Sequence, residues 1–99
     1  MTLSFQVPNS TVDDVKKSLK GVLTTDIPSF AKVDWDNDDL LVKIDKAGKS
    51  EFRIAVKADG GHVKIHETKR SVALLHKAFV GQVEGFVEKI LSKIGAKRA

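Results

Sequence analysis

The chain has 99 residues, with 17 lysines and arginines against 13 aspartates and glutamates, and no cysteine. This length suffices for one domain, and the lack of cysteine excludes disulfides, thiol catalysis and cysteine-ligated zinc. The N-terminal residues do not read as a signal peptide, and no stretch approaches the roughly 18 apolar residues of a membrane span, so we expect a cytoplasmic protein.

The first expected elements are a short strand and an amphipathic helix. Apolar and polar side chains alternate over residues 3–7, as in a strand with one buried face. Ser10 or Thr11 can then cap a helix, and Asp13 and Asp14 follow in its first turn, where the helix dipole favours negative charge. Apolar residues recur at steps of three and four as far as Leu23, which predicts three to four turns.

The middle of the chain predicts an antiparallel meander. Short stretches with apolar residues on one face favour strands over residues 30–35, 40–45, 52–57 and 63–66. Between them lie turns at residues 36–39, 46–50 and 59–61, and the last of these, Asp-Gly-Gly, is a strong hairpin signal.

A long amphipathic helix is expected at the end of the chain. Ser71 can cap it, its apolar stripe runs from Val72 to Ile94, and Gly95 can end it. Residues 95–99 are expected to form a frayed tail.

These elements predict an α+β fold over residues 1–99, with no second domain. An antiparallel sheet of four to five strands, with two helices on one face, buries all the apolar stripes in the order β-α-β-β-β-(β)-α. The expected core residues are Phe5, Val15, Leu19, Trp35, Val42, Phe52, Ile54, Val56, Ile65, Leu75, Phe79, Val83, Phe86 and Ile90.

If the helices cover one face of the sheet, the opposite face is basic. One interpretation is phosphate contact with RNA or DNA, and the other is that the charges keep an exposed sheet soluble. Few arginines are present and no exposed aromatic ring is expected on this face, so neither base reading nor base stacking is indicated. The candidate residues are Lys43, Arg53, Lys57, Lys64, His62 and His66.

The final helix offers a second candidate surface. Val80, Val87 and Leu91 widen its apolar stripe. If the first helix and one sheet face leave them uncovered, they mark a site of partner contact or self-association. If the first helix and the loop around Ile27 and Phe30 cover the stripe, they belong to the core.

No catalytic, metal or cofactor site is predicted. His62 and His66 are about 13 Å apart along a strand, too far to share one metal ion. His76 is interpreted as a residue at the helix boundary. The acidic residues 34–39 are interpreted as a turn, since they lack the glycine and glutamate of a calcium loop. No phosphate-binding glycine motif or nucleophile elbow occurs.

The order of elements, Trp35 before a strand, the segment 48–56, and the ending Leu74-Leu75-His76-Lys77-Ala78-Phe79 resemble the small bacterial family of polyhydroxyalkanoic acid system proteins. This resemblance implies association with polyester granules and no reaction. The same order of elements is similar to that of ribosome hibernation factors and double-stranded-RNA-binding-like folds.

We therefore expect a non-catalytic accessory protein that acts through its C-terminal helix or through self-association, with granule association as the implied setting. The alternative is a nucleic-acid or ribosome-binding module that uses the basic sheet face.

Overall fold

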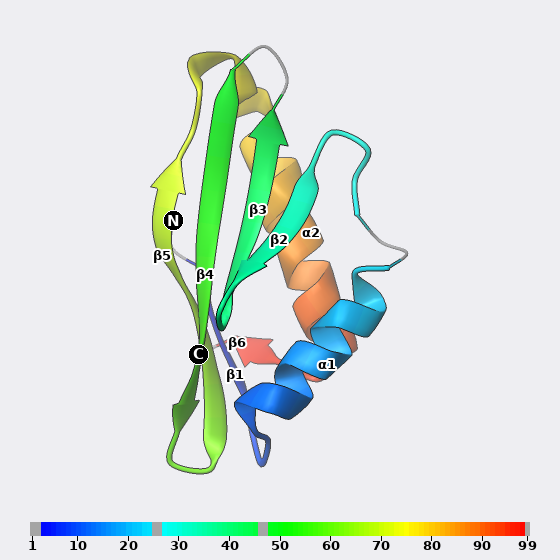
Figure 1. The fold of residues 1–99 in the computed structure, drawn as a ribbon, viewed down its shortest axis with the longest axis vertical. Helices are drawn as coiled ribbons and strands as arrows, with labels where there is room; N and C mark the ends of the chain where they lie inside the picture. Colours follow the sequence, from blue (N-terminus) through cyan, green and yellow to red (C-terminus); the bar gives the residue numbers. More distant parts are fainter. Residues whose placement is uncertain (1–2, 25–26, 46–47, 99) are drawn as a thin grey trace.

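The computed structural model describes residues 3–24, 27–45 and 48–98. It is an α+β fold in which an antiparallel sheet carries two α-helices on one face (Figure 1). The elements are β1 (Ser4–Val7), α1 (Val12–Val22), β2 (Lys32–Asp36), β3 (Asp39–Asp45), β4 (Lys49–Asp59), β5 (His62–Ser71), the 3₁₀ helix η1 (Leu74–Phe79), α2 (Val80–Lys93) and β6 (Lys97–Arg98).

The sheet has six strands in the order β2-β3-β4-β5-β1-β6, rather than the four to five expected. The additional strand is β6, which pairs with β1 through Phe5 opposite Arg98 and Gln6 opposite Lys97. The prediction of a frayed tail over residues 95–99 is therefore wrong for Lys97 and Arg98. A local pattern cannot show this pairing, because β6 has only two residues and its partner strand is at the other end of the chain.

Local sequence signals set the ends of several elements. The Thr11 hydroxyl accepts a hydrogen bond from the Asp14 backbone N–H at 3.2 Å and so caps α1. Gly60 and Gly61 form the two-residue turn between β4 and β5, with φ angles of 56° and 86°. Positive φ at both positions favours glycine, as in the hairpin turns that match the twist of paired strands. The predicted turn at residues 46–50 falls partly outside the described residues, and Lys49 and Ser50 belong to β4.

The predicted final helix starts later than expected. Ser71 is the last residue of β5, opposite Glu51, and does not cap a helix. The chain then enters η1, whose N-cap residue Ala73 has no side-chain cap. Its backbone N–H instead donates to the Ser50 hydroxyl at 2.8 Å. The capping oxygen comes from β4, so the segment around Ser71 gives no sign of it.

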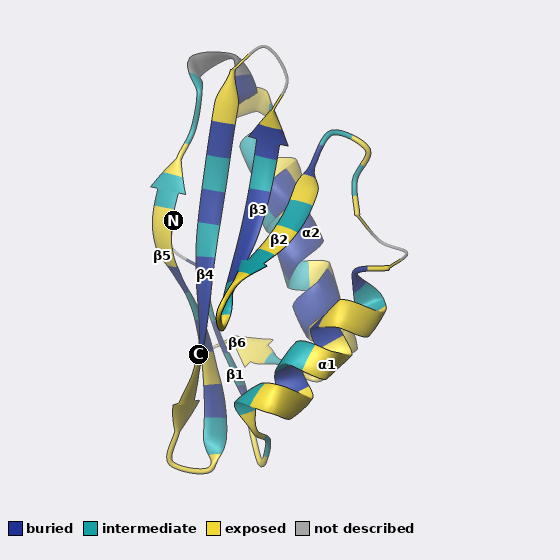
Figure 2. Cartoon of the chain, in the orientation of Figure 1, coloured by how far each residue is buried: buried dark blue, intermediate teal, exposed yellow. Residues whose placement is uncertain are grey.

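Apolar side chains from the sheet and both helices form one core, and most predicted core residues are buried in it (Figure 2). Trp35 and Phe79 are only half-buried at its edge, and Phe79 stacks on Phe30 with 4.9 Å between ring centroids. Trp35 is flanked by the amines of Lys16 and Lys20, at 5.3 and 5.7 Å from the ring centroid. The side chain of Leu75 lies outside the described set. The predicted residues that are buried are Phe5, Val15, Leu19, Val42, Phe52, Ile54, Val56, Ile65, Val83, Phe86 and Ile90.

Candidate anion-binding face

Strand register places the predicted basic residues on the side of the sheet that faces away from the helices. In an antiparallel pair, residues directly opposite each other share a face, and successive residues alternate between faces. Lys57 lies opposite Lys64, and His66 lies opposite Ala55. Their sequence neighbours Val56, Val63 and Ile65 are buried in the core. We call this side of the sheet the open face.

Charge divides the open face into two halves. On the half formed by β2 and β3, Arg53 extends from β4 towards two carboxylates. Its Nε donates to Asp39 at 2.7 Å and its Nη2 donates to Asp36 at 2.5 Å. These two hydrogen bonds raise the pKa of Arg53. Lys43 lies between Glu51 of β4 and Lys32 of β2 on the same half. The expectation that Arg53 is an available cation is therefore wrong, because its guanidinium is already paired within the protein.

The half formed by β4, β5, β1 and β6 carries a line of lysines. Lys57 is opposite Lys64, Lys64 is opposite Gln6, and Gln6 is opposite Lys97. Neighbouring strands are about 4.8 Å apart, so the backbone positions of the three lysines span about 14 Å in a line that crosses four strands. We call Lys57, Lys64 and Lys97 the lysine row.

All three lysines are exposed, and none has an ion pair with any carboxylate among the described residues. Two like charges placed directly opposite each other on paired strands destabilise the sheet. Solubility needs charge on the open face but does not need Lys57 and Lys64 to be adjacent. The row is thus an arrangement that an anionic ligand would stabilise.

His66 lies beside this row, on the same strand as Lys64. Its imidazole is half-buried, and its Nδ1 is buried without a hydrogen-bond partner among the described residues. Burial, followed by the charges of Lys64 and Lys57, lowers the pKa of His66, whereas Asp39 acts in the opposite direction.

His62 lies near the tip of the β4–β5 hairpin, opposite Asp59. Its Nδ1 is likewise buried without a partner among the described residues. A shallow hollow at the start of α1 includes His62, Ser10 and Thr11 in its lining. His62 therefore flanks Lys64 on the side opposite to His66, two residues away along β5 and nearer the end of the sheet.

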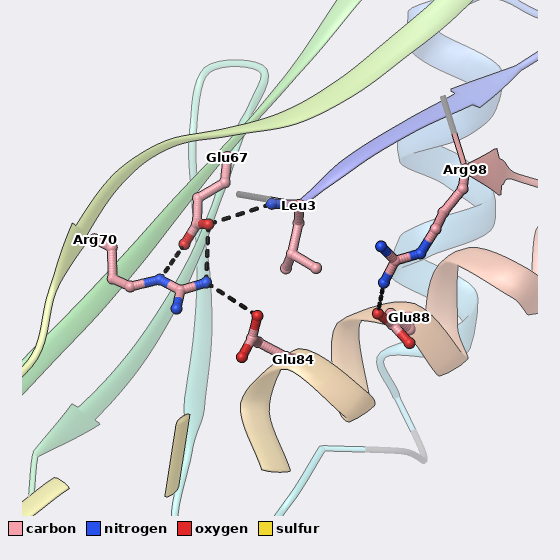
Figure 3. A network of polar contacts seen from close by, with 6 residues as sticks. All are labelled: Leu3, Glu67, Arg70, Glu84, Glu88 and Arg98. Carbon is pink, nitrogen blue, oxygen red and sulfur yellow. Dashed lines mark hydrogen bonds and ion pairs between the residues drawn. The ribbon is translucent and has the colours of Figure 1, made fainter. Parts of the chain in front are cut away.

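The remaining two arginines hold the helix layer and β6 against the sheet (Figure 3). Arg70 donates to the buried Glu67 at 2.7 and 2.9 Å and to Glu84 of α2 at 3.4 Å. These carboxylates, Glu67 first, raise the pKa of Arg70. Arg98 of β6 pairs with Glu88 of α2. Because all three arginines of the chain bind carboxylates within it, the open face presents lysines as its unpaired cations.

This arrangement suits attraction to phosphate better than recognition of bases. Lysine is a point charge without the planar fork that arginine uses to read guanine. No Phe or Trp side chain lies on the basic half of the open face among the described residues, so a stacking platform is lacking there.

Three residues on the basic half were not among the candidates predicted from the sequence. Gln6 and Lys97 complete the line from β4 to β6, but Lys97 was assigned to a frayed tail. Lys69, opposite Arg53, is also exposed on this face. The alternation in the first strand marks Gln6 as facing outward, but no sequence signal indicates that Lys97 lies beside it.

The prediction that Val80, Val87 and Leu91 form a contact surface on the final helix is wrong. Val87 and Leu91 are each 1% exposed and belong to the core, and Val80 is half-buried against it. The α2 helix packs on the sheet and beside α1, so a single sheet face and one short helix do cover the wide stripe (Figure 1). Among the large apolar residues described, Ile27 alone is strongly exposed.

His76 lies in η1, at the boundary of the final helix, and is buried. Its Nδ1 lies 2.6 Å from the Ser50 hydroxyl, which also accepts from the Ala73 N–H. Ser50 borders a hollow of about 390 Å³ that Lys43 and Lys49 also line. Ser50 is 3% exposed and His76 is 1% exposed, so a substrate cannot reach either residue in this conformation. The contact between them joins η1 to β4.

Within the described residues, no group of three or more potential metal ligands lies together. The described helices include none that is long and apolar enough to cross a membrane.

Comparison with known proteins gives no relative. No protein-family model, no curated protein sequence and no solved structure matches the chain. The resemblance to polyhydroxyalkanoic acid system proteins, and the similarity in element order to ribosome-associated and RNA-binding folds, therefore remain predictions.

Proposed function

We propose that this protein is a non-catalytic binding module that holds nucleic acid by its phosphate backbone on the basic half of the open face. The observation that carries the proposal is the lysine row. It places three lysines, which have no ion pair among the described residues, in one cross-strand line over four strands, with two of them directly opposite each other. A phosphate backbone would replace this repulsion with attraction and would release its condensed counterions.

The binding is proposed to be independent of sequence. Arg53, Arg70 and Arg98 are all engaged with carboxylates, so the side chain best suited to reading base edges is occupied. Contacts to phosphate position a protein on nucleic acid without carrying sequence information.

The main expectation from the sequence placed partner contact or self-association on the final helix, with nucleic-acid binding as the alternative. The burial of Val87 and Leu91 removes the exposed residues on which that expectation depended. The residues of the lysine row, in contrast, are exposed in the folded protein and can contact a ligand.

Fluorescence anisotropy with a labelled 20-base-pair duplex, measured between 50 and 200 mM salt, tests the proposal. Three phosphate contacts give a slope of log K against log salt of about −2.7, which is a loss of about 40-fold over this range. The double variant K57Q/K64Q should retain one contact and reduce the slope to about −0.9.

The matched control is K17Q/K89Q, which removes the same charge from exposed positions on α1 and α2. It should keep the wild-type slope, and duplexes of unrelated sequence should bind alike. Failure of the wild-type protein to bind any duplex at 50 mM salt would refute the proposal. Equal losses in the two double variants would show that net charge, rather than the lysine row, governs binding.

A further inference from the structure

Two histidines flank the lysine row on the open face, since His62 and His66 each lie two residues from Lys64 on β5. They differ in their neighbours, because His62 lies opposite the carboxylate of Asp59 whereas His66 lies opposite Ala55. His66 is placed by register between Ala55 of β4 and Ser4 of β1. Neither neighbour carries a charge. Histidine has an ordinary pKa of about 6.5, so a modest change in its surroundings alters its protonation in the physiological range.

The charged groups that act on His66 come from its own strand and from β4 and β3. Lys64 precedes it by two residues on the same face of β5, and Lys57 lies diagonally across on β4. Asp39 of β3 lies beyond Ala55 in the same cross-strand line. The two lysines oppose a positive charge on the imidazole, and the single carboxylate favours it.

In the free protein, burial adds to this opposition. The Nδ1 atom is shielded from solvent and has no partner among the described residues, so an N–H there would remain unsatisfied. Burial and the two lysines together lower the pKa of His66, which favours the neutral imidazole.

We infer that His66 is the proton-dependent member of the basic half, taking up a proton when a phosphate polymer binds across the lysine row. This inference depends on the proposed function. A polyanion near Lys57 and Lys64 offsets their repulsion and supplies negative charge beside the imidazole. The protonated form of His66 then adds a fourth positive charge to the site.

Proton uptake on binding makes affinity depend on pH in a defined direction. By linkage, a ligand that favours the protonated form binds more tightly as the pH falls. With one proton involved, the affinity changes by at most about tenfold per pH unit. The phosphodiester groups of the duplex keep their charge over this range, so the response reports on the protein.

The test measures the Kd of the same labelled duplex at pH 5.5, 6.5 and 8.0 at constant ionic strength. We expect the wild-type affinity to rise as the pH falls. His66→Gln should bind as the wild type does at pH 8.0 but lose most of the rise. His62→Gln is the matched control, since it removes the other histidine that flanks Lys64, the one that lies opposite Asp59, and it should keep most of the rise.

A second measurement follows the His66 ring proton by NMR through a pH titration, with and without the duplex. The pKa of His66 should increase when the duplex is bound, and circular dichroism at each pH verifies that the variants are folded. A rise in affinity that persists in His66→Gln, or a His66 pKa that the duplex leaves unchanged, would overturn the inference.

The outcomes separate the two proposals. Binding at pH 8.0 that requires Lys57 and Lys64 but shows no pH response refutes the role of His66 and leaves the proposed function standing. An absence of duplex binding at all three pH values refutes both.

Discussion

The substitution Glu67→Gln is expected to destabilise the fold strongly, although it changes only one oxygen to an amide. Glu67 has a side chain that is 5% exposed, and both of its oxygens accept from Arg70, whose side chain is 24% exposed. Its Oε1 also accepts from the Leu3 N–H at 3.4 Å (Figure 3). The amide cannot balance the guanidinium charge, so Arg70 would be left partly buried with only Glu84 as a charged partner.

The expected cost follows from these contacts. Removing one partner of a fully buried ion pair costs about 3–5 kcal/mol. Arg70 retains some solvent contact and its bond to Glu84, so we expect a loss of about 2–3 kcal/mol in the free energy of unfolding. For a domain of this size, that lowers the Tm by roughly 8 to 24 °C.

Urea unfolding and thermal melting, both followed by circular dichroism at pH 7, measure the loss. The control is Glu88→Gln, which removes the partner of Arg98 in a pair whose side chains are 40% and 53% exposed. Exposed pairs contribute little, so this variant should lose no more than about 0.5 kcal/mol. If Glu67→Gln costs no more than Glu88→Gln, the network does not hold α2 against the sheet and the reasoning is wrong.

Three further predictions concern stability. Ser50→Ala should lower the free energy of unfolding in urea by about 1–3 kcal/mol, because the Ala73 N–H and His76 Nδ1 lose their shared hydroxyl. An unchanged free energy of unfolding would show that these two contacts do not stabilise the fold. Leu91→Ala should lower the free energy of unfolding by about 2–4 kcal/mol, as expected of a core residue. A loss under about 0.5 kcal/mol would show that Leu91 is a surface residue. The lowered pKa of His66 means that the unfolded chain binds this proton more readily, so the His66 contribution should reduce stability as the pH falls below about 6.5. Unfolding at pH 5.5 and 7.5 should show a smaller pH difference in His66→Gln than in the wild type, and an equal difference would contradict the cause given.

Much of the fold follows from local sequence. Alternation around Phe52–Val56 and the step of three or four residues in the helices identify the buried faces, because side chains repeat every two residues in strands and every 3.6 in helices. The Thr11 cap and the Gly60-Gly61 turn also depend on residues close in sequence. The shared face of Lys57, Lys64 and His66 follows from the same alternation.

Tertiary structure decided which cations are free. Arg53 was expected to contribute to the basic face, but Asp36 and Asp39 reach it only once β2, β3 and β4 are paired. Lys97 joins the lysine row because the last strand lies beside the first. Charge counted along the chain cannot separate a paired cation from an unpaired one.

A register shift in β5 decided the position of Arg70. Glu67 is opposite Ile54 and Lys69 is opposite Arg53, so Thr68 is an extra residue in the strand. This bulge places Glu67 and Arg70, three residues apart, on the same side of the sheet, where regular alternation would put them on opposite sides. The sequence by itself determined strands β1 to β5, the two α-helices and their apolar faces, because those depend on the spacing of near neighbours. Tertiary structure alone decided the ion pairs, the remote cap of η1 and the lysine row, because each requires strands and helices distant in sequence to be brought into one register.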